Sequence, residues 1–548
     1  MNRLQPFILA VVGALALVLA HEPFTVWPLA YVGLALIAQL TWDDALTSRR
    51  RGLALALAGA VYFGVGCHWL LETAWFNWIG MTIPEALTFP ASALIARRMH
   101  VFVPRWPRAL VFPIAFGAVE YVRARFPFNG YPWLLVGATQ PASLAQIVAW
   151  IGTSGLGLVL AFAGASLREF VARRREPAAL ALHAAAFLAC IGGLFSFATF
   201  CVDVDEAAQN FGARTRVALV QGNISQQLKH APKTEREILA IQLRGTRAAL
   251  AKAGEFGFDL MCWAETMFPY PMAHDDAPGT WFTSGFGADD AQAIEREFVA
   301  GDLLRGTLKD ARASLLLGAI TCSGAAPRER ADHNSALLFD SEGVRRGRYS
   351  KTLLVPGGEF IPLRSILPAA VDRWVEEAAG FLPRLVPGDG PRAFELPRRD
   401  GTTATFATTI CYENVYPGYA AAVGALDVDF VVNLSNEGWF GVSSEFDQME
   451  AASILRAIEM RTPVVRATNT GISAIYDAYG RRVAVLTDES GRDRGVEGVL
   501  IADVPPRPAG KSPFVRMGEL PAWMAALVAL VGFVGGCLRS GYFRRRRT

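Results

Sequence analysis

Three side chains suited to acyl chemistry stand at the ends of strand-like runs in the middle of the sequence. Glu265 closes the run LMCWAE, Lys351 follows GRYS, and Cys411 closes TFATTIC. Apolar, β-branched runs of this kind are typical of strands that are buried on both faces. Functional groups at the same end of such strands converge at one edge of a sheet. We therefore predict that the carboxylate, the amine and the thiol share one site.

These three groups are a workable set for acyl transfer. Glu265, as a general base, would take the thiol proton and later return it to a leaving group. The thiolate of Cys411 would attack an acyl carbonyl and form a thioester. We expect the Lys351 ammonium to lower the pKa of the thiol and to stabilise the tetrahedral oxyanion. A helix that begins just after Cys411 would favour the thiolate further.

The sequence lacks the motifs that other catalytic mechanisms require. Each of the three residues taken alone also has an ordinary structural explanation. A cysteine in an apolar run is most often an inert core residue. The central histidines, His230, His274 and His333, stand beside no nucleophile motif, and the sequence contains no GxSxG. The seven cysteines show no CxxC and no metal-like spacing, so neither a disulfide framework nor a metal site is predicted. No cofactor is expected, because nucleophile and base are both protein groups.

The composition indicates a membrane protein with a large water-exposed part. The chain has 548 residues, of which 52% are hydrophobic, and it is too long for one ordinary core. The apolar residues concentrate in 1–201 and 520–538, whereas the middle has a globular composition. The net charge is +3, with no basic stripe interleaved with aromatic residues, which argues against a nucleic-acid partner.

Eight apolar segments are of membrane length or slightly shorter. Basic clusters follow every second segment, at 49–51, 97–108, 168–175 and 544–547. This bias predicts that both termini are cytoplasmic and that the long connection at 202–519 lies on the outer face. Arg123 and Arg125, in a predicted outer loop, are the one discord. The segments are 6–20, 26–41, 52–71, 84–96, 109–122, 145–167, 179–201 and 521–538.

We therefore expect three parts: a transmembrane domain at 1–201 with about seven helices, a globular domain at 202–519, and a C-terminal helix with a basic tail at 520–548. The globular part alternates strand-like runs with helical stretches such as 235–253 and 288–313, as an α/β sandwich does. The strand-like runs include 216–221, 260–264, 314–320, 335–340, 405–410 and 429–434. Two long loops, about 266–286 and 353–387, are candidate lids or binding segments.

Aromatic residues crowd the predicted outer loops, and one carboxylate lies within a span. The aromatic clusters are typical of an interfacial belt, and a lipid-facing entrance to a site is the sharper alternative. Glu120 is a functional candidate because intramembrane carboxylates are costly, but it can also simply pair with Arg123. The aromatic residues are His68, Trp69, Trp75, Phe76, Trp78, Phe126, Phe128, Tyr131 and Trp133.

The motifs around the three chemical residues resemble the Glu-Lys-Cys signature of the nitrilase superfamily. These motifs are WAE at 263–265, YSKTLLVPGGEFIPL at 349–363, TICYE at 409–413 and NLSNEGWFG at 433–441. Further stretches are similar to the branch formed by the apolipoprotein N-acyltransferases of bacterial inner membranes, as is the eight-span layout. They are ALVQGNISQ at 218–226, RAIEMRTPVVRATNTGISAIYDAYGR at 456–481, EYVRARFPFNGYPWLLVGATQ at 120–140 and AQIVAWIGTSGLGLVLA at 145–161.

The resemblance implies a role for each matching residue. Glu265 would be the base, Lys351 the oxyanion-stabilising amine and Cys411 the acyl-carrying nucleophile, with no metal. The family usually has WPE, PFGE and NDAWFG where this chain has WAE, PGGE and NEGWFG. These departures remove no catalytic group but leave substrate preference and the loop near Trp439 open. Supporting or substrate-binding roles would fall to Glu359, Tyr412, Glu413, Asn334 and Trp439.

The resemblance also implies a fold and a reaction. The fold would be a polytopic α-helical membrane domain of about eight transmembrane helices plus an extracytoplasmic nitrilase-like αββα sandwich. A fatty acyl chain would pass from a phospholipid to a Cys411 thioester, and then to the α-amino group of the N-terminal diacylglyceryl-cysteine of an apolipoprotein, in a ping-pong sequence. The partners would be these two substrates and the bilayer, with no nucleic acid and an oligomeric state that the sequence leaves open.

The implied location is the bacterial inner (cytoplasmic) membrane, with multiple spans and the catalytic domain on the periplasmic side. Two alternatives stay open. A membrane-bound nitrilase-like amidase or hydrolase would use water as the acceptor, although one span would suffice to tether it. A non-catalytic membrane scaffold or transporter is the other, and the intact Glu265, Lys351 and Cys411 weigh against it.

Overall fold

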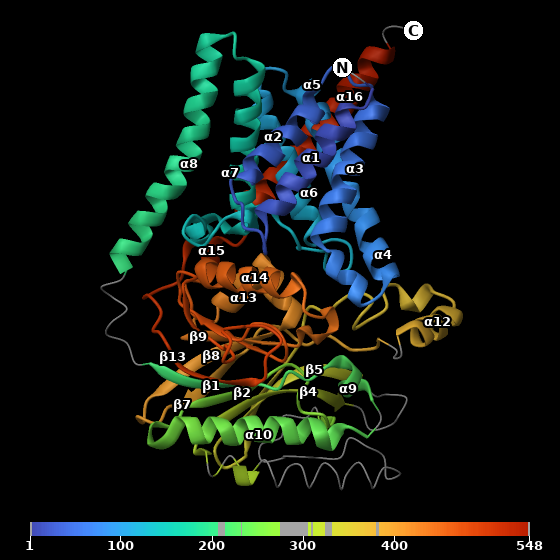
Figure 1. Ribbon diagram of the computed structural model, residues 1–548. Helices are drawn as coiled ribbons and strands as arrows, with labels where there is room; N and C mark the ends of the chain where they lie inside the picture. The colour runs from blue at the N-terminus through green and yellow to red at the C-terminus, as the bar shows by residue number, and fades with distance from the viewer. Residues whose placement is uncertain are drawn as a thin grey trace.

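A bundle of long apolar helices stands on an α/β domain built from two sheets (Figure 1). This arrangement is seen in a computed structural model of the protein. It describes residues 3–205, 214–231, 233–273, 305–307, 309, 311–323, 331–379 and 383–545.

The bundle contains the N-terminal helices and the last helix of the chain. Each of the eight apolar segments expected from the sequence lies on one or two of these helices. The helices are α1 (Gln5–Ala20), α2 (Leu29–Trp42), α3 (Ser48–Gly66), α4 (Trp75–Ala86), α5 (Thr88–Phe102), α6 (Arg108–Arg123), α7 (Val148–Ala172), α8 (Pro177–Asp205) and α16 (Leu520–Arg545).

Four helical stretches among the described residues are both long and apolar enough to cross a membrane. They are Trp75–Phe102, Ala145–Ala172, Pro177–Phe200 and Leu520–Gly541. Helices α1 and α2 are apolar but shorter, so the count of eight spans stays a prediction. Large apolar side chains are exposed along α8 and α16, for example Leu188, Phe195 and Leu530. Such surfaces are what lipid contact requires.

The fourth expected segment, 84–96, differs from the structure in its bounds. It crosses the junction between α4, which ends at Ala86, and α5, which begins at Thr88. The two helices form one apolar stretch of 28 residues from Trp75 to Phe102. The expected segment begins too late, at Pro84, because a proline usually interrupts a helix. In the structure α4 continues through Pro84.

The α/β domain has two sheets that pack face to face. The first has the strand order β13-β1-β2-β4-β5-β6, with β3 beside β4, and the second has the order β12-β11-β10-β9-β8-β7. In chain order the strands are β1 (Thr215–Gln221), β2 (Leu260–Trp263), β3 (Met272–Ala273), β4 (Ser314–Ser323), β5 (Ala331–Phe339), β6 (Arg345–Ser350), β7 (Ala393–Pro397), β8 (Thr403–Ile410), β9 (Phe430–Ser435), β10 (Val464–Thr468), β11 (Ala474–Tyr476), β12 (Arg482–Val485) and β13 (Gly498–Val504).

Helices cover the outer face of each sheet, which makes the αββα layering expected from the resemblance. Alternate strand residues such as Leu219 and Val432 fill the core between the sheets. Helix α10 (Glu235–Ala253) covers the first sheet, where Leu243 packs with Val220. Helices α13 (Pro417–Gly424) and α14 (Glu445–Met460) cover the second sheet and lie between it and the bundle (Figure 1). The shorter helices are α9 (Gln226–His230), α12 (Ala369–Ala379) and α15 (Pro513–Met517).

The expected strands all occur, with bounds that differ by a few residues, and the expected helix 235–253 is α10. The other expected helix, 288–313, and the second half of the loop 266–286 lie largely outside the described residues, as does His274. The loop 353–387 is described in part and carries α12.

Polar and aromatic side chains join the bundle to the α/β domain. Gln448 of α14 accepts hydrogen bonds from the indoles of Trp69 and Trp133 and donates to the Gly66 carbonyl at 2.9 Å. Glu459 accepts from the backbone N–H and the hydroxyl of Thr153, both at 2.7 Å. Two of the aromatic residues expected at the membrane interface are therefore buried docking contacts between the two parts.

Glu120 pairs with Arg123, the simpler of the two explanations that the sequence left open. The closest oxygen–nitrogen distance is 3.5 Å. The Val136 N–H also donates to Glu120 Oε1 at 2.9 Å. Arg123 in turn donates to three carbonyls of the loop at 131–134. The pair therefore shapes the loop at 131–134, which contacts α14 through Trp133.

Candidate active site

Cys411 begins a tight turn directly after β8. The turn is a single 3-10 element, Cys411–Val415, and Cys411 itself has a φ of 51°. A non-glycine residue in the left-handed region is uncommon, and such strain is concentrated at functional sites. The thiol is half-buried, and the Asn433 side chain donates to the Cys411 carbonyl at 3.5 Å.

Glu265 and Lys351 meet at the end of the first sheet. Glu265 follows β2 and Lys351 follows β6, and the two antiparallel steps from β4 through β5 make β6 run in the same direction as β2. The Lys351 Nζ lies 3.4 Å from Glu265 Oε1 and 2.9 Å from Glu359 Oε1. Lys351 is only 1% exposed, so this cation and its two carboxylates are held out of water.

The thiol comes from the other sheet, which corrects one expectation. The sequence reasoning placed all three groups at one edge of one sheet. In the structure β8 belongs to the second sheet, whereas β2 and β6 belong to the first. The site is therefore formed between the ends of two facing sheets. The charges of Glu265 and Lys351 both influence the pKa of the Cys411 thiol, and that the three groups form one active site stays a prediction.

Asn334 and Asn436 fix the orientation of the Glu265 carboxylate. Asn334 Nδ2 donates to Glu265 Oε1 at 2.7 Å and to Glu359 Oε1 at 3.1 Å. The Asn436 backbone N–H donates to the other oxygen, Glu265 Oε2, at 2.8 Å. The structure thus brings Asn334 into direct contact with Glu265, and it places Glu359 in contact with Asn334 and Lys351.

The expected effect of Lys351 on the thiol is present, but burial outweighs it. Lys351 lowers the pKa of Cys411, whereas burial and the Glu265 carboxylate raise it, and the pKa lies well above its usual range. The sequence alone does not allow burial to be weighed against the ammonium. For Lys351 itself, burial lowers the pKa, but Glu359 and Glu265 outweigh it and raise the pKa well above its ordinary value. The resting site therefore holds a protonated thiol beside a permanent ammonium.

This thiol pKa predicts slow alkylation at neutral pH. We expect iodoacetamide to modify Cys411 more slowly at pH 7 than the same cysteine in unfolded protein. The rate should rise about tenfold per pH unit up to pH 9, because the thiolate fraction grows in that proportion below the pKa. Peptide mapping of the modified protein at pH 7, 8 and 9 measures the rate. A rate that is already constant from pH 7 upward would contradict the raised pKa.

Glu413 joins the two catalytic segments without touching the three central groups directly. Its carboxylate accepts from the Tyr349 hydroxyl at 2.6 Å, from the Thr352 N–H at 2.6 Å and from the Ile410 N–H at 2.7 Å. Burial raises the pKa of Glu413 to about 7, although these hydrogen bonds oppose the shift. Glu413 therefore ties the residue after Lys351 to the residue before Cys411.

Tyr412 contacts the bundle, and Trp439 is partly exposed. Tyr412 donates to the Gly130 carbonyl at 3.2 Å and its ring stacks on Trp133, with centroids 6.2 Å apart. It is a contact between the nucleophile turn and the bundle. Trp439 lies on the turn Glu437–Phe440 and is 37% exposed, where a ligand can reach it.

Lys229 is a residue that sequence reasoning missed. It lies on α9, and its ammonium donates to the hydroxyl of Thr266, the residue after the base. Burial lowers the pKa of Lys229 to about 8, against the opposing influence of Glu265 and Cys411. Its stretch, QQLKH, reads as an ordinary polar helix, and only its position just after ALVQGNISQ connects it to the site.

Comparisons with known proteins cover nearly the whole chain. Residues 13–166 match the family model "Apolipoprotein N-acyltransferase N-terminal domain", and residues 216–511 match "Carbon-nitrogen hydrolase". The apolipoprotein N-acyltransferase of Caulobacter vibrioides is 31% identical over 97% of this chain and 94% of its own length. That of Rhodopseudomonas palustris is 29% identical over 94% and 91%. A solved amidase from Nesterenkonia sp. is 19% identical, covers 54% of this chain and 91% of its own, and has a TM-score of 0.33.

Proposed function

The chain belongs to the apolipoprotein N-acyltransferase family, and we propose that Cys411 is the residue that carries the acyl group between the two substrates. The protein is an acyltransferase of lipoprotein maturation and a bacterial membrane protein. Its α/β domain is nitrilase-like, with two sheets. The observation that carries the proposal for Cys411 is the buried cluster of Lys351, Glu265 and Glu359 whose charges act on the strained cysteine.

In the first half-reaction the acyl donor is a phospholipid. The Glu265 carboxylate takes the proton from the Cys411 thiol as sulfur attacks the ester carbonyl. The oxygen that becomes negative is stabilised by the Lys351 ammonium, which is buried and therefore acts at low dielectric. When the carbon–oxygen bond breaks, Glu265 returns the proton to the glycerol oxygen. The products are a lysophospholipid and a Cys411 thioester.

In the second half-reaction the acceptor is the free α-amino group of the diacylglyceryl-cysteine at the N-terminus of an apolipoprotein. The neutral amine attacks the thioester carbonyl and loses a proton to Glu265. The carbon–sulfur bond then breaks, and Glu265 passes this proton to the Cys411 sulfur. An amide forms, the thiol is restored, and Glu265 has shuttled one proton in each half. The site needs no group beyond these side chains for either step.

We infer that both reactions take place at the outer surface of the inner membrane, with the α/β domain in the periplasm. The alternating basic clusters support this orientation. The hydroxyls of Tyr412 and Tyr416, on and just after the nucleophile turn, donate to Gly130 in an outer loop of the bundle at 3.2 and 3.3 Å. Such closeness suits substrates whose acyl chains remain in the bilayer. The division at 201/202 and 519/520 and the eight spans belong to the same proposal.

The products of one incubation test this function. Purified protein is mixed with phosphatidylethanolamine and a synthetic diacylglyceryl-cysteine peptide. We expect N-acylated peptide and lysophospholipid in equal amounts, because each transfer produces one of each. Free fatty acid in place of the acylated peptide would show a hydrolase that uses water, and no turnover at all would show a scaffold. The matched control is the same peptide with its α-amino group acetylated, which should give no acylated product.

A further inference from the structure

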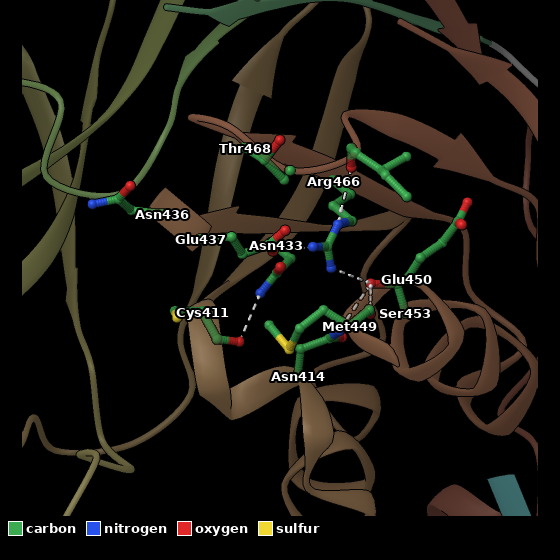
Figure 2. Close-up of polar contacts among 12 residues, drawn as sticks. Cys411, Asn414, Asn433, Asn436, Glu437, Met449, Glu450, Ser453, Arg466 and Thr468 are labelled. Carbon is green, nitrogen blue, oxygen red and sulfur yellow. Dashed lines mark hydrogen bonds and ion pairs between the residues drawn. The ribbon is translucent and has the colours of Figure 1, made fainter. Parts of the chain in front are cut away.

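We propose that Arg466 is a positioning residue. Through one buried polar network it fixes the Glu265 carboxylate and the turn that begins at Cys411 relative to each other. The inference rests on the proposed roles of Glu265 and Cys411. Arg466 lies on β10, where its register partner on β9 is Asn433, and it is 0% exposed. Its guanidinium forms an ion pair with Glu437 and donates to the Ser453 hydroxyl at 3.3 Å and the Ile472 carbonyl at 3.0 Å. Figure 2 shows Arg466, Glu437 and Ser453 in one view with Cys411.

One branch of the network leads to the base. Glu437 directly follows Asn436, whose backbone N–H donates to Glu265 Oε2 at 2.8 Å. The Asn436 side chain is itself held by Asn469 Nδ2 at 2.9 Å. Because the Glu437 side chain is anchored on Arg466, the peptide that supports one oxygen of the base cannot shift without breaking a buried ion pair.

The other branch leads to the nucleophile. The Ser453 hydroxyl, on α14, accepts from Asn414 Nδ2 at 2.8 Å. Asn414 also donates to the Met449 carbonyl at 3.1 Å and belongs to the turn that begins with Cys411. The guanidinium of Arg466 therefore reaches the nucleophile turn through one hydroxyl and one amide (Figure 2).

The chemistry of the network points to positioning rather than to stability alone. Apolar side chains of similar volume usually replace a buried ion pair without loss of stability. Here Glu437 and Arg466 are both 0% exposed, and the carboxyls of Glu445 and Glu450 act on the same guanidinium. A multidentate cation that links two catalytic segments is what precise placement of reacting groups requires.

The departure from the family motif falls within this network. Glu437 stands where the related motif has Asp, so its carboxylate reaches one methylene further. Gly471 provides the room, because a Cβ at that position would collide with Glu437 Oε2. The absence of a side chain at Gly471 therefore leaves space for the longer Glu437 side chain to pair with Arg466.

The test measures single-turnover acylation of Cys411 by phosphatidylethanolamine in the full-length protein. We expect Arg466→Lys to lower the acylation rate constant about 10- to 100-fold, with the phospholipid concentration for half-maximal rate unchanged within about twofold. A lysine carries all its donors on one nitrogen and lacks the planar fork of arginine, so it does not reproduce the spacing of the bonds to Glu437, Ser453 and Ile472. The control is Arg244→Met, which removes an exposed arginine 3.6 Å from Glu497 and should leave the rate unchanged.

Two further variants separate the branches and remain informative if Arg466→Lys fails to fold. Ser453→Ala should lower the acylation rate constant about tenfold with the half-maximal phospholipid concentration unchanged, because it removes the link between Arg466 and Asn414. Glu437→Gln should also lower the rate constant about tenfold at an unchanged half-maximal concentration, because it weakens the anchor of the peptide whose N–H donates to Glu265 Oε2.

The outcomes distinguish this inference from the proposed function. If the parent protein forms no adduct on Cys411, the proposed function fails. If the parent acylates normally and folded Arg466→Lys, Ser453→Ala and Glu437→Gln do so at the parent rate, only the positioning role is overturned. A raised half-maximal phospholipid concentration at an unchanged rate constant would also overturn it, since it would indicate a role in binding. In the double variant Arg466→Lys/Ser453→Ala, we expect a loss smaller than the product of the two single losses.

Discussion

We expect the replacement of Cys411 by serine to abolish acyl transfer, while the protein still folds. The expected loss of turnover is about 10⁴-fold or more, the scale seen when an enzyme loses its covalent nucleophile. A hydroxyl paired with a carboxylate base is a far weaker nucleophile than a thiolate. Stability should change little, because Cys→Ser alters one half-buried atom. The measurement is N-acylated peptide formed per minute, with the melting temperature recorded beside it.

A matched variant shows whether this loss is specific. Cys537→Ser makes the same change in an exposed cysteine on α16 and should retain full turnover. If Cys411→Ser kept more than a few per cent of the parent activity, the acyl group would have to travel by another route.

Replacing Glu265 by glutamine should lower the rate of acyl transfer but raise the rate at which Cys411 is alkylated. Acyl transfer should fall about 10³- to 10⁴-fold, because the thiol loses its base and the leaving oxygen its proton donor. Alkylation of Cys411 at pH 8 should become faster. The Glu265 charge raises the pKa of the thiol and Lys351 lowers it, so removal of the carboxylate charge leaves more thiolate at a given pH.

The two assays together separate a catalytic base from a structural residue. A variant that only disturbed the site would alter alkylation without a consistent direction. If Glu265→Gln lowered both transfer and alkylation, the assigned direction of the electrostatic coupling would be wrong. The control is Glu497→Gln, a change of the same type at a side chain that is 57% exposed, for which we expect no effect on either rate.

The three candidate catalytic residues could be identified from the sequence because each stands at the end of a strand-like run within a recognisable motif. Glu265 and Lys351 prove to be 3.4 Å apart, although 85 residues separate them in the chain. The origin of Cys411 from the second sheet was not predictable, because strand order is set by pairing between distant segments. For the same reason the net direction of the thiol pKa shift was not predictable: it depends on burial that only the packed structure reveals.

The residues that support the site were harder to predict. Glu359 and Asn334 were identified through resemblance alone, and both contact Glu265 or Lys351. Lys229 was missed because a lysine in a polar stretch is usually solvent-exposed. Arg466 was also missed, since an arginine within the apolar run TPVVRAT shows its role only when Glu437 and Ser453 are placed around it.

Whether Cys411 carries the acyl group can be tested directly by one mass measurement. Purified protein is incubated with phosphatidylethanolamine alone, and its intact mass and peptide map are recorded before and after addition of a diacylglyceryl-cysteine peptide. We predict an increase equal to one fatty acyl group, mapped to Cys411, that disappears as N-acylated peptide forms. An adduct on another residue, or peptide acylation with no adduct on Cys411 at any time, would show that Cys411 is not the acyl carrier.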